Sequence, residues 1–152
     1  MKSYVFTGLV CLMLSAPFVL SAQTEIFPKQ QITEKPALFS NLPEQFTINS
    51  TEFEKLLAAA EGQSLNLKLS AQCTLNTVLL SKVSRNAHLQ SINLRLQNYN
   101  GALFNLTVDN SGAVLRFTGR ILHPQYGDVL LLQFDGKSYQ LKKLQQQYFM
   151  AE

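Results

Sequence analysis

Hydrophobic and polar residues alternate along most of the chain after Gly62, a pattern typical of half-buried β-strands. In 64–70, S-L-N-L-K-L-S, every second residue is a leucine. The same period of two recurs further along, while other segments are apolar without a helical period. The strands expected from these patterns are 64–70, 74–83, 91–97, 102–109, 113–123, 129–134 and 138–144.

The alternation also predicts which side chains face the core. The inward set is Leu65, Leu67, Leu69, Ile92, Leu94, Leu96, Ala102, Phe104, Leu106, Val108, Leu115, Phe117 and Ile121. The opposite face is polar and therefore solvated, with Asn93, Arg95, Gln97, Asn105, Thr107, Asp109, Arg116, Thr118 and Arg120. The segment 129–134, V-L-L-L-Q-F, is apolar on both faces, so we expect it to be a central or covered strand.

The connections between these strands are rich in turn residues. Asn100-Gly101 and Asp135-Gly136 are pairs that tolerate the positive φ of type I′ hairpin turns. Asp109–Gly112 is a longer turn of the same chemistry, and 123–127 joins the next two strands. Gly119, inside a strand, predicts a bulge or a close backbone approach. The fold expected is mostly β (α+β), a roughly seven-stranded antiparallel meander that forms a curled sheet or a small barrel.

One helix is expected before the strands, at about 51–61. Thr51 and Glu54 have the spacing of a capping box. Phe53, Leu56, Leu57 and Ala60 then recur at helical spacing on one apolar face. Gly62 is placed to end the helix in the left-handed conformation.

The first 22 residues have the layout of a secretory signal peptide: Lys2, an apolar run, and a small residue before the cut. Cleavage is expected between Ala22 and Gln23, although Leu20 is larger than the usual residue at its position. The alternative is an uncleaved membrane anchor. The signal predicts export to the periplasm or the extracellular space, with no stable membrane insertion after cleavage.

Residues 23–48 predict an extended N-terminal arm, because Pro28, Pro36 and Pro43 disfavour helix and the apolar residues follow no period. We expect the later part of this arm to pack on a single β-rich domain of residues 49–152. Removal of the signal leaves Cys73 as the one cysteine, so no intramolecular disulfide is expected.

Charge argues against a nucleic-acid partner. The formal net charge is +3, and it falls to +2 without Lys2. Residues 63–152 carry nine bases and four acids, while 23–62 carry three bases and six acids. This is a mildly basic body rather than the clustered basic surface of a nucleic-acid-binding domain.

Candidate chemistry is sparse. The two histidines, His88 and His123, lie in expected loops without metal-ligand spacing, so neither a metal site nor a cofactor is predicted. Cys73 could meet a histidine across strands, with Asp128 orienting the base, but nothing in the spacing selects that nucleophilic arrangement. The sequence therefore predicts no enzyme.

Two weak binding candidates remain. His123, Tyr126 and Asp128 lie close together in one loop and could bind a ligand, although Pro124 and Gly127 also explain that loop as a plain turn. Arg95, Arg116 and Arg120 could form an anion-binding patch, or they could be ordinary residues of a solvated sheet face.

The leading hypothesis for function is an exported non-catalytic protein that binds another macromolecule, as an accessory, inhibitory or envelope-assembly protein. The partner expected is a protein, held through residues 23–48 or an edge strand. One alternative is a carrier of a small apolar ligand inside a barrel. The other is a hydrolase that uses Cys73 or the 123–128 loop.

Overall fold

The computed structural model describes residues 35–145; the expected signal peptide and the first part of the arm lie outside the described residues. The described elements are β1 (Gln45–Ile48), a 3-10 helix η1 (Ser50–Phe53), α1 (Glu54–Ala58), β2 (Ser64–Lys68), β3 (Thr74–Ser84), β4 (Leu89–Leu96), β5 (Leu103–Asp109), β6 (Arg116–Leu122), β7 (Asp128–Phe134) and β8 (Tyr139–Gln145). No helix among these residues is long and apolar enough to cross a membrane.

All eight strands belong to one antiparallel sheet with the order β1-β8-β7-β6-β5-β4-β3-β2. The mostly β meander predicted from the alternation is confirmed, and the seven expected strands are β2 to β8. The eighth strand, β1, comes from the segment expected to be an extended arm, and it pairs with β8 at the far end of the chain.

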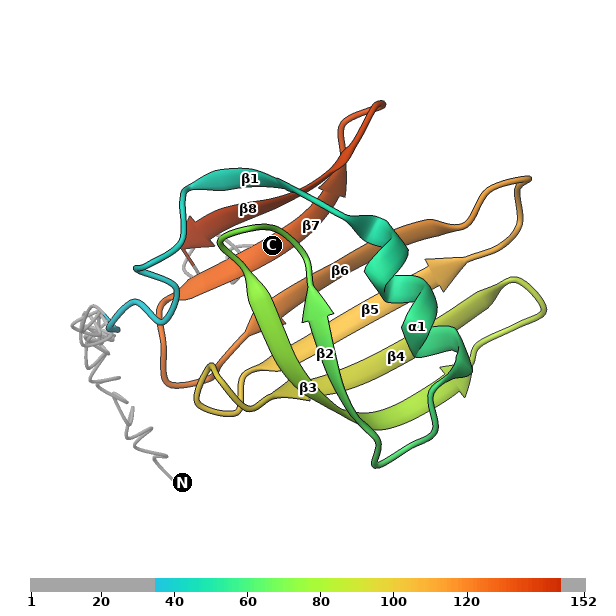
Figure 1. The fold of residues 1–152 in the computed structure, drawn as a ribbon, viewed down its shortest axis with the longest axis horizontal. Coiled ribbons are helices and arrows are strands. Elements are labelled where there is room, and N and C mark those ends of the chain that lie inside the picture. The colour runs from blue at the N-terminus through green and yellow to red at the C-terminus, as the bar shows by residue number, and fades with distance from the viewer. Residues whose placement is uncertain (1–34, 146–152) are drawn as a thin grey trace, which may run out of the picture. The chain divides into compact units, whose positions relative to one another are not determined.

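The sheet curls into a half-barrel, and the β2–β3 hairpin lies across the front of the other strands (Figure 1). One hydrogen bond joins the residues that directly follow the two edge strands β1 and β2, from the Asn49 N–H to the Leu69 carbonyl at 2.7 Å. Beside it, the Lys68 N–H donates to a Glu52 carboxylate oxygen at 3.1 Å. The gap between the edge strands β1 and β2 is therefore bridged at one place, and most of the two strand edges do not pair with each other.

The helix is shorter than expected and capped differently. Asn49, rather than Thr51, is the N-cap, and its side chain accepts hydrogen bonds from the backbone and the hydroxyl of Thr51. Ala59 already has an extended backbone, with ψ of 148°. The chain turns there because Gly62, with φ of +80°, must start β2 beside β3. The expected left-handed conformation at Gly62 is confirmed, but Gly62 does not end the helix, which stops at Ala58.

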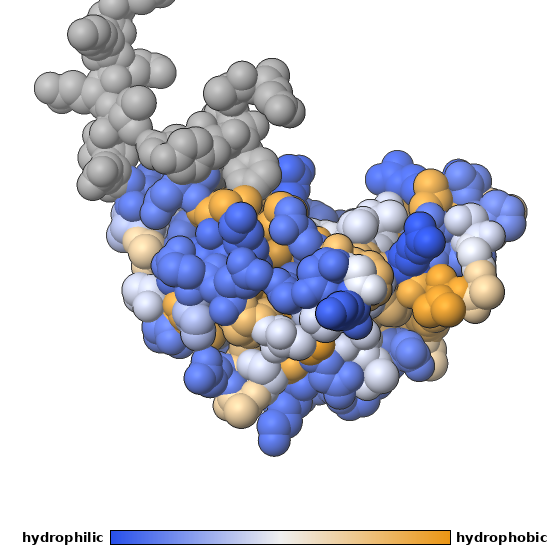
Figure 2. Space-filling model, turned by 90° about the horizontal axis from the view of Figure 1, so that it is seen from above, coloured by the Kyte–Doolittle hydropathy of each residue, from blue (hydrophilic) through white to orange (hydrophobic). Residues whose placement is uncertain are grey.

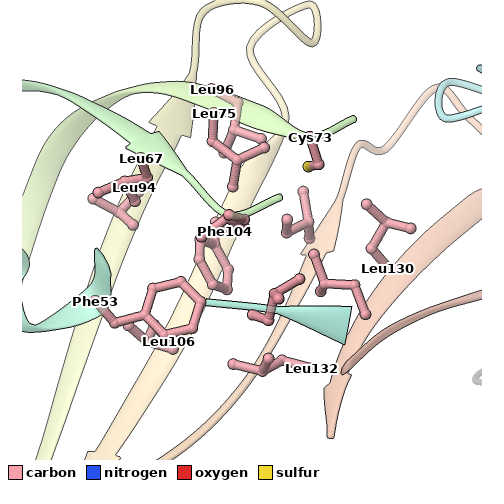
Figure 3. Close-up of a cluster of buried hydrophobic side chains, with 14 of the residues drawn as sticks. Phe53, Leu67, Cys73, Leu75, Leu94, Leu96, Phe104, Leu106, Leu130 and Leu132 are labelled. Atoms are coloured by element: carbon pink, nitrogen blue, oxygen red, sulfur yellow. The ribbon is translucent and has the colours of Figure 1, made fainter. Parts of the chain in front are cut away.

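The interior of the half-barrel is occupied by side chains (Figure 3). Most of the residues expected to point inward are fully buried, including Leu94, Phe104 and Ile121, whereas Leu65 and Leu115 are half-buried at the margin. Phe53 reaches in from η1 and packs its ring against Phe104 at 5.8 Å and Phe117 at 5.4 Å between centroids. Aromatic contacts of this geometry add to the burial energy.

Three inward-facing charged side chains bind the segments that lie over the rim of the half-barrel, which are the end of α1 and residues 35–42. The ammonium of Lys82 donates to the carbonyls of Leu57 and Ala59 at the end of α1. The ammonium of Lys143 donates to the Leu42 carbonyl at 2.7 Å. Both Asp128 carboxylate oxygens accept backbone N–H groups of the segment 35–42, which we call the strap. Each buried or half-buried charge is thereby hydrogen-bonded, as burial requires.

The type I′ turn predicted at Asn100-Gly101 is confirmed, whereas the one predicted at Asp135-Gly136 is wrong in part. Asn100 and Gly101 both have positive φ, of 50° and 80°, as a type I′ turn requires. In the Asp135-Gly136 pair only Gly136 has positive φ. Asp135 instead accepts the N–H groups of Lys137 and Ser138 through its side chain, which closes a four-residue loop.

Gly119 is predicted to be intolerant of a side chain. A Cβ there would lie 2.5 Å from the Asn105 carbonyl oxygen and 3.2 Å from the Leu106 Cα. Because these are backbone atoms of the neighbouring strand, the sheet must shift, and we expect Gly119→Ala to lower the free energy of unfolding by about 1–3 kcal/mol. Gly112→Ala is the matched control for urea denaturation, since its nearest neighbour would be 3.9 Å away. Equal stability of the two variants would contradict the close approach.

Candidate functional site

The connections β3–β4, β5–β6 and β7–β8 lie together at one end of the half-barrel, which we call the hairpin end. A pocket of about 170 Å³ opens there between α1 and the first two connections. Its apolar lining comes from Leu57, Ala87, Leu89, Val108 and Leu115, and its polar lining from Ser84, Asn86, His88, Gln90 and Asn110.

Hydrogen bonds within the two loops hold the walls of this pocket in place. The Asn86 side chain accepts the N–H groups of His88 and Leu89, both at 2.8 Å. The Asn110 N–H donates to the His88 carbonyl and so joins the two loops. The Ser111 N–H donates to Asp109, and this hydrogen bond is the largest cause of a lowered Asp109 carboxyl pKa. The pocket is therefore preformed.

Exposed apolar side chains gather at the same end. Among residues 35–145, the exposed large hydrophobic side chains are Leu80 (37% exposed), Val83 (44%), Val114 (76%) and Phe134 (56%). Val83, Val114 and Phe134 lie in or beside the three connections of the hairpin end, whereas Leu80 lies within β3. Figure 2 shows a mostly hydrophilic face on which hydrophobic side chains appear in separate groups, one of them on the lobe at the right.

Sequence reasoning missed this site. Leu57, Leu89, Val108 and Leu115 belong to four different elements or loops, so no local motif unites them. A usable signal was present at Val114, because it is a large apolar residue next to the turn 109–112 where solvated residues are expected.

The predicted ligand loop, with His123, Tyr126 and Asp128, lies at the opposite end of the half-barrel. His123 and Tyr126 are brought together, with ring centroids 4.9 Å apart. Their polar atoms contact the chain itself: the Tyr126 hydroxyl accepts from Asn100, and the His123 Nδ1 accepts from the Gln125 N–H.

Asp128 does not share their surface. It is 1% exposed, and its oxygens accept the N–H groups of Leu38 and Phe39, each at 2.7 Å. The Gly127 N–H also donates to the Pro36 carbonyl. This end of the barrel is therefore covered by the strap, and Asp128 binds the strap rather than the backbone of its own turn.

The three candidate arginines all lie exposed on the outer face of the sheet, but they are not in contact. Arg95 pairs in register with Leu103 on β5, while Arg120 pairs with Asn105 and Arg116 with Asp109. From strand geometry, neighbouring arginines in this set are about 12–13 Å apart at Cα. They form a spread positive face rather than a binding pocket.

Cys73 is a free, fully buried thiol at the end of the β2–β3 turn, pointing among leucines of the core (Figure 3). Desolvation by burial raises the pKa of this thiol to about 11. A thiolate nucleophile needs the opposite environment, with an exposed sulfur and a lowered pKa.

Cys73 gives a testable pH dependence. The pKa of this thiol in the folded protein is about 11, above the ordinary value of 9.0. The contribution of the protonated thiol to the free energy of unfolding is therefore fully present below pH 9 and is lost as the pH rises to 11. We expect a loss of about 2–3 kcal/mol over this window, measured by urea denaturation. Cys73→Ala should flatten this slope. Native protein should also resist thiol labelling at neutral pH, and fast labelling would contradict the burial.

No group of three or more histidine, cysteine, aspartate or glutamate side chains within 35–145 is arranged to hold a metal ion. Comparison of the chain with protein-family models, with curated proteins and with solved structures found no match.

Proposed function

We propose that this is an exported, non-catalytic protein that binds another macromolecule, most simply a protein, through its hairpin end. The observation that carries the proposal is that the exposed apolar residues Val83, Val114 and Phe134 lie at the same end of the half-barrel as a preformed pocket. Exposed apolar patches framed by polar residues are a recurrent feature of protein-binding surfaces.

The size of the pocket favours a partner's side chain over a free ligand. Sites for small molecules usually measure about 300–1,000 Å³. A volume of about 170 Å³ suits one apolar side chain of a partner, with the surrounding hairpins adding contact area. The side chains that fill the barrel interior, such as Phe53 and Phe104, weigh against the alternative of a carrier with a ligand inside.

Two observations weigh against the hydrolase alternative. The raised pKa of Cys73 disfavours a thiolate, and both carboxylate oxygens of Asp128 are engaged by the strap. Export is proposed from the first 22 residues of the sequence, and intact mass of the purified protein would show whether it begins at Gln23.

Affinity capture after cross-linking in the native host tests the proposal. We expect the protein to retain a discrete partner, and the double variant Val83→Asp/Val114→Asp to lose it, because two carboxylates would replace two exposed apolar side chains of the hairpin end. These exposed positions allow the variant to fold, which urea denaturation would verify.

The matched control is Ala71→Asp/Gln125→Asp, which adds the same two carboxylates to exposed turns at the opposite end. The control should capture the partner normally. Deletion of 23–48 is a poorer test, because it removes β1 and the buried Phe39 and Leu42. Equal capture by the two double variants would exclude the hairpin end.

A further inference from the structure

The outer face of the sheet carries all of the net positive charge of residues 35–145. The strand residues that point outward include five bases and one acid: Lys68, Arg95, Arg116, Arg120, Lys142 and Asp109. The other residues from 35 to 145 contain six bases and six acids. The outward-pointing strand residues thus carry a net charge of +4, whereas the other residues from 35 to 145 sum to zero.

Four of these five cations have no acidic neighbour in the cross-strand register, whereas Arg116 lies opposite Asp109. The two ion pairs found within 35–145 join Lys55 to Glu52 and Lys143 to Glu44, and neither involves an outer-face cation. Arg95, Arg116, Arg120 and Lys142 are all exposed. The cross-strand register also places the half-buried side chains of Leu103 and Leu122 in one row with Arg95.

We propose that this outer face is a docking surface for an anionic phospholipid membrane. Basic side chains gain about 1 kcal/mol each near such a surface, so several act together without a defined pocket. The partly exposed Leu103 and Leu122 beside Arg95 suit the boundary between headgroups and acyl chains. The hairpin end lies at the ends of the strands and stays free for a partner.

The arrangement fits a membrane better than the other anionic partners. A single phosphate site needs convergent donors, whereas these arginines are about 12–13 Å apart along and across the strands. A second copy of the chain would bring two positive faces together and be repelled. Long side chains at wide spacing match laterally mobile lipid headgroups. The proposal of a membrane contact does not depend on the protein partner proposed for the hairpin end.

Vesicle co-sedimentation tests the proposal, using protein purified from cells that express the complete sequence. The readout is the ratio of binding to phosphatidylglycerol–phosphatidylcholine vesicles over binding to pure phosphatidylcholine vesicles. This ratio is insensitive to any apolar N-terminal segment that the cell leaves in place. We expect preferential binding to the anionic vesicles that weakens at high salt.

The double variant Arg95→Gln/Arg120→Gln should lower binding to anionic vesicles about 25-fold, since each cation contributes a factor of about five. The control Lys55→Gln/Lys137→Gln removes the same charge from exposed positions off this face and should bind like the unaltered protein. No preference for anionic vesicles, or an equal loss in the control, would overturn the proposal. Capture of an acidic protein that is lost in the arginine variant, without vesicle binding, would also overturn it.

Discussion

Phe53→Ala is expected to lower the free energy of unfolding by about 3–5 kcal/mol, the largest effect of any single change considered. Phe53 is fully buried and contacts the rings of Phe104 and Phe117. Its removal leaves a cavity in the middle of the half-barrel, because strands β5 and β6 are fixed in register and cannot close it. Urea denaturation measures the loss.

Two further variants make this prediction specific. Phe53→Leu should lose much less stability, since most of the volume is kept. Val114→Ala removes an apolar side chain that is 76% exposed and should change the stability by less than about 0.5 kcal/mol. If Phe53→Ala proves as stable as Val114→Ala, the filled interior is wrong and the carrier alternative regains support.

Asp128→Asn is expected to lower the free energy of unfolding by about 2–4 kcal/mol, although it changes only one atom of the side chain. The carboxylate accepts two N–H groups, from Leu38 and Phe39, in a nearly water-free site. An amide keeps one acceptor and turns an N–H donor toward the other N–H. One strap N–H group is then buried without a partner.

Amide hydrogen exchange gives this prediction a local readout. The N–H groups of Leu38 and Phe39 should exchange much faster in Asp128→Asn, because the strap loses its anchor. Asp135→Asn alters a carboxylate that caps an exposed turn and should leave both the strap amides and the overall stability nearly unchanged. Slow exchange at Leu38 and Phe39 in the Asp128 variant would show that other contacts hold the strap.

The strands from β2 to β8 could be predicted because most contain an alternating pattern, the others are short apolar runs such as 129–134, and most are joined to the next by a recognisable turn. β1 could not be found in this way. Gln45–Ile48 is four residues long and is stabilised by β8, almost a hundred residues away. The predicted N-cap is wrong for a related reason, since Asn49 directly follows β1 and its N–H is fixed by the Leu69 carbonyl.

The candidate sites show the same limit. The loop 123–128 contains residues of promising types, yet the strap, which precedes it by about ninety residues, takes up Asp128. The hairpin-end pocket has no residue of special chemistry except His88, and it exists only because α1 and two loops meet. Local composition therefore predicts neither the binding of the strap by Asp128 nor the pocket at the hairpin end.

Photo-crosslinking in the native host shows whether the hairpin end contacts a partner. A photoreactive residue at position 114, in the exposed loop of the hairpin end, is compared with one at position 118, exposed on the outer face of β6. We expect a discrete protein adduct from position 114 and none of the same mass from position 118. An adduct from position 118 alone, or no protein adduct from either position, would contradict the proposed contact.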